Sequence, residues 1–151
     1  SGQRTQELVC FFMFVPCQGG GPQPGLCDFF RQGLFMSVVR FGVRPTWKLA
    51  LVTQWAEEIE HEILQGRKVM RLEAMVVKSS RQNLGIGTRA LKLALLEADE
   101  QELEVFLATQ EEKSVPFYQR LGFEIVREAL HEEGNFKSWF MLRPPGGIAA
   151  A

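Results

Sequence analysis

The chain has 151 residues, of which 46% are hydrophobic and 23% are charged, and its formal net charge is −1. This length suits one domain with a hydrophobic core, and the near-neutral charge argues against a global basic field for nucleic acid or an anionic membrane. The three cysteines all lie within residues 10–27 and have no CxxC or Cys/His ligand spacing. This usage argues against a disulfide framework and a metal site, and it favours a reducing, cytoplasmic location.

The first expected element is a buried strand over residues 8–15, LVCFFMFV, which we expect to stop at Pro16. Eight apolar residues are too few for a membrane helix, which needs about 20, so no membrane association is expected. Glycine and proline dominate residues 17–25, which predicts a flexible loop. Two helices are expected next, over residues 26–41 and 45–65.

The second of these helices carries one apolar stripe, because hydrophobic residues recur at steps of three and four. The stripe consists of Leu49, Val52, Ala56, Ile59 and Ile63. The opposite face is expected to be a solvated surface that carries Glu57, Glu58, Glu60 and His61. Trp47, Trp55 and Trp139 could shape an apolar pocket, but core packing is favoured for each.

The second half of the chain alternates strands and helices. We expect strands at 68–77 and 103–109, a helix at 87–99 between them, a short helix at 114–121 and a terminal hairpin. The first two of these strands should be parallel through a right-handed crossover. Ser114 is a plausible N-cap of the short helix, and residues 144–151 are expected to form a frayed tail. The order predicts an α/β or α+β sheet domain.

A glycine turn, QNLGIGT, joins strand 68–77 to the next helix. Glycines before a helix N-terminus let backbone N–H groups close around an anion. Two phosphate-binding patterns fail, because no lysine follows Gly87 and Ala90 stands where a Rossmann turn has its third glycine. A tight strand-to-helix turn without a ligand therefore remains an alternative at this point.

Two motifs in this half of the chain resemble signatures of the GNAT superfamily of N-acetyltransferases. Gln82-x-x-Gly85-x-Gly87 is similar to the family's Q/R-x-x-G-x-G/A loop, and SVPFYQRLGFEIV (114–126) is similar to its second signature. The resemblance is close over residues 68–143. It implies a mixed, mostly antiparallel sheet with a splayed parallel strand pair, flanked by helices. The chain is expected to form one domain, residues 1–151, that lacks the family's usual first strand and helix.

The resemblance implies a site for acetyl-CoA as co-substrate. The pyrophosphate would rest on the glycine loop, and the pantetheine arm would pair with the edge of strand 68–77. In place of the signature's asparagine stands Ser114, which would contact the cofactor less extensively. The binding residues implied are Met75, Val76, Val77, Gln82, Asn83, Leu84, Gly85, Ile86, Gly87, Thr88, Ser114 and Tyr118. Basic residues around this groove could attract the cofactor: Lys78, Arg81, Arg89, Lys92 and Lys113.

Two residues are candidates for acid–base chemistry. Tyr118, the only tyrosine, falls on the tyrosine that the family uses as general acid; aromatic packing is its alternative role. Glu73 lies in an otherwise apolar strand, where burial would raise its pKa and make it a base for the amine. Its alternative role is an ion pair with Arg71, which shares its face at a spacing of two residues.

The sequence thus predicts an acetyl-CoA-dependent N-acetyltransferase that acts on a primary amine of a small molecule or protein. The alternative is a non-catalytic GNAT-fold module that binds CoA or a protein partner. A nucleic-acid module is disfavoured because no stripe of basic and aromatic residues is present. An exposed strand or hairpin edge would allow two copies to pair as a homodimer.

Overall fold

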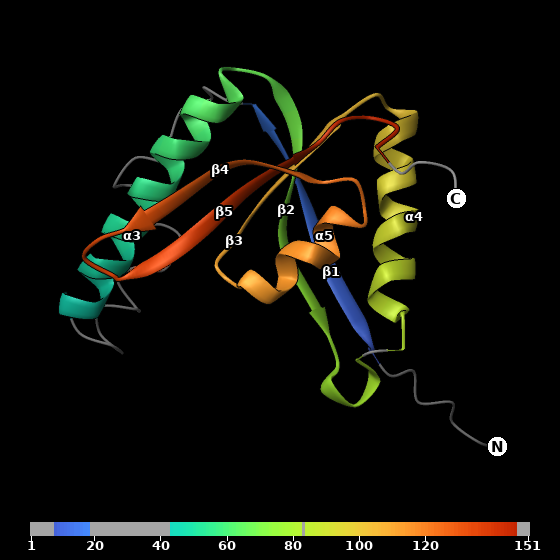
Figure 1. Ribbon diagram of the computed structural model, residues 1–151, viewed down its shortest axis with the longest axis horizontal. Helices are drawn as coiled ribbons and strands as arrows, with labels where there is room; N and C mark the ends of the chain where they lie inside the picture. Colours follow the sequence, from blue (N-terminus) through green and yellow to red (C-terminus); the bar gives the residue numbers. More distant parts are fainter. Residues whose placement is uncertain (1–7, 19–42, 83, 148–151) are drawn as a thin grey trace.

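The computed structural model describes residues 8–18, 43–82 and 84–147 (Figure 1). The predicted helix 26–41, most of the predicted loop 17–25 and the end of the predicted tail lie outside these residues. Within them no helix is both long and apolar enough to cross a bilayer.

The described residues form one five-stranded mixed sheet with the strand order β1-β2-β3-β5-β4. All neighbouring strands are antiparallel except β2 and β3, which are parallel, as the sequence predicts. The predicted α/β class and mostly antiparallel sheet are confirmed. The strands are β1 (Cys10–Gln18), β2 (Lys68–Val77), β3 (Glu104–Thr109), β4 (Glu124–His131) and β5 (Phe136–Arg143).

The first strand runs further than predicted. It continues through Pro16 to Gln18, and Pro16 pairs with Met70 of β2. The prediction that the strand ends at Pro16 is therefore wrong. β1 is an edge strand, and an edge tolerates a proline whose missing N–H has no ladder partner to satisfy.

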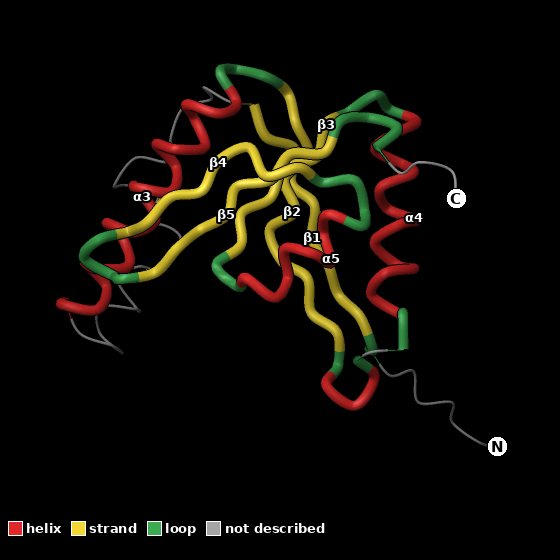
Figure 2. Tube along the Cα trace, in the orientation of Figure 1, coloured by secondary structure: helices red, strands yellow, loops and turns green. Residues whose placement is uncertain are grey.

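Helices cover both faces of the sheet, as Figures 1 and 2 show. Helix α3 (Val43–Leu64) lies on one face, and α4 (Ile86–Glu100) and α5 (Val115–Gln119) lie on the other. Successive side chains of β3 point to opposite faces of the sheet. Phe106 packs toward α3, while Val105 and Leu107 pack toward α4.

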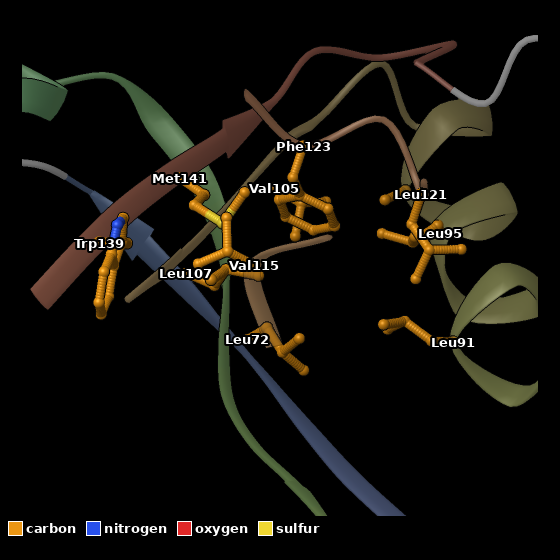
Figure 3. Packing of buried hydrophobic residues seen from close by; sticks show 11 residues of the cluster. Leu72, Leu91, Leu95, Val105, Leu107, Val115, Leu121, Phe123, Trp139 and Met141 are labelled. Atoms are coloured by element: carbon orange, nitrogen blue, oxygen red, sulfur yellow. The ribbon is translucent and has the colours of Figure 1, made fainter. Parts of the chain in front are cut away.

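The larger core lies on the α4 face. Leu91 and Leu95 of α4 are fully buried there, and they face buried side chains from the sheet and from the segment around α5 (Figure 3). A smaller cluster on the α3 face is formed by Ile59, Leu64, Val69, Phe106 and Phe140. Of the stripe predicted on the long helix, Ile59 belongs to this cluster and Ile63 packs against it. Trp139 belongs to the larger core, which agrees with its predicted packing role.

The parallel strands separate soon after they meet. The pairing of β2 with β3 covers only Val69 to Arg71 opposite Glu104 to Phe106, although β2 continues to Val77. Beyond Arg71, β2 stays with β1 and β3 stays with β5, so the sheet opens into two arms (Figure 2). The predicted splayed pair is thus present.

A bulge at Glu73 changes which β2 side chains face α4. The register with β1 passes from Leu72 directly to Ala74, which leaves Glu73 as the extra residue. Before the bulge, Met70 and Leu72 contact the larger core, whereas after it Met75 and Val77 lie against α4. The bulge therefore lets β2 present odd-numbered side chains to the helix that follows the glycine turn.

A buried arginine fixes the end of α4 to the end of the sheet. The side chain of Arg143 is fully buried, and its Nη1 and Nη2 donate to the two carboxylate oxygens of Asp99 at 2.7 and 2.6 Å. Its Nε donates to the carbonyl of Leu121 at 3.0 Å. The Gly146 N–H also donates to Asp99 at 2.7 Å. Residues 144–147, predicted as the start of a frayed tail, are therefore held in a turn.

Candidate functional site

A cleft of about 520 Å³ lies on the α4 face, where the arm of β2 leaves β3. It is bounded by the end of β2, the first turn of α4, and α5. The lining residues are Met75, Val77, Arg81, Gln82, Gly85, Ile86, Gly87, Thr88, Ser114, Phe117, Tyr118 and Arg120. Residues from the two GNAT-like motifs, about 30 positions apart, therefore meet at one cavity.

The two glycines of the turn are needed for different reasons. Gly85 caps α4 with φ +71°, a left-handed conformation that favours glycine. Gly87 lies so close to β2 that a Cβ there would be 2.8 Å from Met75 Cε and 3.0 Å from Val77 Cγ2. A side chain at position 87 would crowd Met75 and Val77, so glycine favours the close approach of the first turn of α4 to the strand.

The start of α4 directs backbone donors at the cleft. The first helical hydrogen bond of α4 runs from the Arg89 N–H to the Gly85 carbonyl at 3.0 Å. The N–H groups of Ile86, Gly87 and Thr88 precede it and have no partner within the helix. With the positive end of the helix dipole, they form a favourable position for an anion.

The edge of β2 presents its backbone to the cleft at alternate residues. The Lys78 N–H donates to the Val9 carbonyl at 2.8 Å, and backbone direction alternates along a strand. The N–H and C=O groups of Met75 and Val77 consequently point away from β1, toward the opening. The Gln82 side chain donates from Nε2 to the Val77 carbonyl at 3.1 Å, which fixes the glycine turn to the strand end.

Tyr118 lies half-buried in the cleft wall, in edge contact with Phe117 and Phe123. Burial raises the pKa of its phenol, and the negative charge of Glu111 raises this pKa further. The phenol consequently stays protonated at neutral pH and can donate a hydrogen bond to negative charge that develops in the cleft.

Ser114 lines the cleft but does not cap α5 through its side chain. It has helical backbone angles, and its Oγ donates to Glu111 Oε2 at 2.8 Å. The predicted N-cap interaction is therefore wrong. A short 3-10 turn, η3 (Glu112–Ser114), runs directly into α5, so Ser114 is already helical where a cap would need extended backbone.

Two arginines line the cleft from opposite sides. Arg81 belongs to the turn η2 (Ser79–Arg81), and Arg120 follows α5. Arg81 is among the basic residues predicted from the sequence, whereas Arg120 and Phe117 are not among the predicted site residues. Phe117 and Arg120 lie three and six residues after Ser114, and this spacing was the available signal, since residues three apart share a helix face. The other predicted basic residues are exposed and do not line this cavity: Lys78, Arg89, Lys92 and Lys113.

Two described residues of the predicted binding set are not in the cleft lining. The side chains of Val76 and Leu84 are 62% and 58% exposed, respectively, and neither contributes to the cavity. Asn83 lies outside the described residues.

Glu73 is not the buried carboxylate that the sequence suggested. Its side chain is 31% exposed and forms an ion pair with Arg71, on the α3 face rather than in the cleft. The bulge explains the difference, because Glu73 is its extra residue and does not continue the pattern of Met75 and Val77. The alternative role as a partner of Arg71 is confirmed.

Comparison with known families agrees with this geometry. The family model described as acetyltransferase (GNAT) domain matches residues 48–138, more than half of the chain. The chain belongs to the GNAT acetyltransferase family. The match includes β2, the glycine turn, α4, β3 and α5, and thus every element that borders the cleft.

Similar solved structures cover different shares of the chain. A mosquito arylalkylamine N-acetyltransferase (like 5b) is 14% identical with a TM-score of 0.56, over 90% of this chain and 68% of that one. Naa20 of Chaetomium thermophilum, solved with a bisubstrate analogue, is 11% identical with a TM-score of 0.55, over 98% and 65%. The ribosomal-protein-S18-alanine N-acetyltransferase of Escherichia coli is 19% identical with a TM-score of 0.44, over 54% and 56%. The chain spans 52% to 58% of the length of the first three structures that it matches.

Proposed function

We propose that the chain is an acetyl-CoA-dependent N-acetyltransferase that passes the acetyl group directly to a primary amine. The proposal depends chiefly on one observation: the splayed edge of β2, the start of α4 and Tyr118 border a single cleft. This cleft presents groups complementary to the phosphates, the pantetheine arm and the thioester of acetyl-CoA.

The phosphates fit the end of the cleft at α4. The N–H groups of Ile86, Gly87 and Thr88 lie at the helix start, and Arg81 and Arg120 line the same cavity. Guanidinium groups bind phosphate oxygens in bidentate fashion, which a lysine cannot do. The positive charge at this end is local, since the chain as a whole carries −1.

The pantetheine arm fits the opening between the strands. Its amide groups would pair with the outward backbone of Met75 and with the Val77 N–H, as a further strand would. The absence of a Cβ at Gly87 keeps α4 close to β2 and so sets the width of the cleft at this point.

Acetyl transfer requires a neutral amine as the nucleophile and a group that stabilises and protonates the leaving thiolate. The amine lone pair attacks the thioester carbonyl carbon, the C–S bond breaks, and the sulfur leaves as a thiolate that takes up a proton. Tyr118 is the proton donor in this proposal. Because its pKa is raised, its main contribution is a hydrogen bond that stabilises the thiolate as the proton moves.

Calorimetric titration with acetyl-CoA tests the cofactor site. Arg81→Glu should weaken binding at least tenfold, because it removes a phosphate partner and adds a repelling carboxylate. Lys92→Glu is the matched control, since Lys92 is basic, exposed and on α4 but does not line the cleft. Desulfo-CoA should bind and ATP should bind much more weakly.

Release of free CoA thiol with a panel of amines then tests turnover. A folded chain that does not bind acetyl-CoA would contradict the cofactor site. A chain that binds acetyl-CoA without accelerating transfer to any amine would instead support the non-catalytic alternative.

A further inference from the structure

A second cavity lies on the opposite face of the sheet, between α3 and the diverging strands. Its volume is about 210 Å³, and its polar lining includes Glu57 and Glu60 of α3 and Arg71 and Glu73 of β2. Leu72 and Phe106 contribute apolar surface. Glu57 and Glu60 were predicted to face solvent, but the structure turns both toward the sheet.

This cavity lies at the same opening as the cleft. Arg71 and Phe106 form the last pair of the parallel strands, and both line the cavity. A few residues further along β2, Met75 and Val77 line the cleft. A molecule in the cavity therefore approaches the gap between the strands from the α3 side, opposite to the α4 side from which we propose that the thioester enters.

Three carboxylates surround one guanidinium in this cavity. The Nη1 of Arg71 donates to both carboxylate oxygens of Glu60, at 3.0 and 2.9 Å, and its Nη2 forms the ion pair with Glu73. Among the described residues, Glu57 forms no ion pair with a cation. The cavity therefore carries an excess of negative charge, and the carboxylate of Glu57 is the one available to a ligand.

The surroundings of Glu57 favour proton uptake. Burial raises the pKa of this carboxyl group, Arg71 lowers it and Glu60 raises it, with a net upward shift. The other charged group facing the cavity is Glu73, while β3 contributes the uncharged Phe106 and Ala108. A carboxylate with a raised pKa is a better proton acceptor near neutral pH than an ordinary exposed one.

We propose that this cavity receives the ammonium group of a compact primary alkylamine and that Glu57 removes the proton that activates it. The inference rests on the proposed acetyl transfer and adds the acceptor class and the base. The small volume admits an unbranched amine, and the negative charge favours an acceptor with a cationic or neutral tail over one with a carboxylate.

The protons balance over the whole transfer. An alkylammonium ion, whose pKa is about 10, gives one proton to Glu57 and becomes the attacking amine. After the N–C bond forms, the nitrogen loses a second proton to solvent, and Glu57 then releases to solvent the proton that it took up. The C–S bond breaks, the thiolate takes a proton from Tyr118, and solvent reprotonates the tyrosine. The products are the N-acetyl amine, CoA thiol and one released proton.

The acceptor class can be tested on the unmodified chain with three amines of equal backbone length. Putrescine carries a second ammonium group, butylamine carries a methyl group, and γ-aminobutyrate carries a carboxylate. We expect kcat/KM for putrescine and butylamine to exceed that for γ-aminobutyrate by at least about tenfold, because the cavity repels the carboxylate. Equal or faster transfer to γ-aminobutyrate would overturn the acceptor class.

The role of Glu57 is tested by Glu57→Gln, which keeps the shape of the side chain. The matched control is Glu58→Gln, because Glu58 is the next residue on α3, is exposed and only accepts a hydrogen bond from Gln54. We expect kcat for butylamine to fall about 100-fold in the first variant and to change less than twofold in the control. Glu57→Asp, which keeps the base but shortens it, should fall between the two.

The pH profile separates loss of a base from a structural effect. In the unmodified chain kcat should rise with pH as Glu57 loses its proton. In Glu57→Gln this rise should disappear, and the rate should follow the ionisation of the amine at higher pH. An unchanged rate and profile in Glu57→Gln, with Tyr118→Phe still impaired, would overturn this inference alone. No acetyl-CoA binding, or no transfer to any amine, would instead overturn the proposed function.

Discussion

The two long helices are attached to the sheet by different means. Helix α4 is anchored by fully buried leucines and by the buried Arg143, which binds both oxygens of Asp99. Among the residues that the structure describes, helix α3 contributes to a smaller apolar cluster and is joined to the strands by ion pairs at the surface, such as Arg127 with Glu62.

This difference matches the chemistry proposed for each face. On the α4 face the cofactor phosphates need backbone donors in fixed positions, and a rigidly anchored helix supplies them. On the α3 face the side chains at the cavity are carboxylates held by one guanidinium, which is an arrangement suited to an exchangeable cationic ligand. The contrast predicts that substitutions at the α4 anchor lower the free energy of unfolding strongly, whereas substitutions at the α3 surface ion pairs lower it only slightly.

The largest effect on stability is expected for Arg143→Met. The change removes a fully buried guanidinium and leaves the Asp99 carboxylate and the Leu121 carbonyl without their partner. We expect the free energy of unfolding in urea to fall by about 3 kcal/mol. The double variant with Asp99→Asn should recover part of this loss. If Arg143→Met lowers the free energy of unfolding by less than about 1 kcal/mol, the contrast between the two helices is wrong.

The next effect concerns the cleft on the α4 face. Tyr118→Phe removes only the hydroxyl group and leaves the packing against Phe117 and Phe123 in place. We expect kcat to fall about 100-fold, while the calorimetric dissociation constant for acetyl-CoA stays within a factor of two. A parallel loss of binding would mean that Tyr118 holds the cofactor rather than the reacting sulfur.

A smaller effect on stability is expected from the protonation of Asp99 as the pH falls. Hydrogen bonds from Arg143 lower the pKa of this carboxyl group below its ordinary value of 3.8 in the folded state. The unfolded chain therefore takes up this proton first as the pH falls, so the stabilisation is complete above the unfolded pKa and is lost as the pH falls through the folded pKa. The difference in unfolding free energy between the unmodified chain and Asp99→Asn should shrink from about pH 6 to about pH 2, and a constant difference would contradict this.

The smallest effect is expected for Arg127→Ala. The side chains of Arg127 and Glu62 are 43% and 63% exposed, so water screens their ion pair between β4 and α3. We expect a loss of less than about 1 kcal/mol in urea unfolding. A loss as large as that of Arg143→Met would show that the surface ion pairs stabilise α3 as much as the buried pair of Arg143 with Asp99 stabilises α4.

Much of the cleft could be predicted from the sequence because its parts are local. The glycine turn, the helix that follows it and the parallel strands follow from short motifs and periodicity, whereas the place of Tyr118 at the cleft was implied by the resemblance to the GNAT signature. Gly85 illustrates the reason, since a left-handed backbone at a helix start restricts the residue type at that one position.

Apart from the pair of Arg71 with Glu73, which the sequence offered as an alternative, the tertiary structure decided which charged residues meet. Glu57 and Glu60 belong to a run that looks solvated along the helix, and only the packing of α3 over Arg71 turns them toward a cavity. The bulge at Glu73 and the contact of Asp99 with Arg143, 44 positions later, depend on how strands and helices from distant parts of the chain come together. Local sequence patterns specify conformation over one or two turns or strands, whereas burial and charge pairing depend on neighbours that only the folded chain brings together.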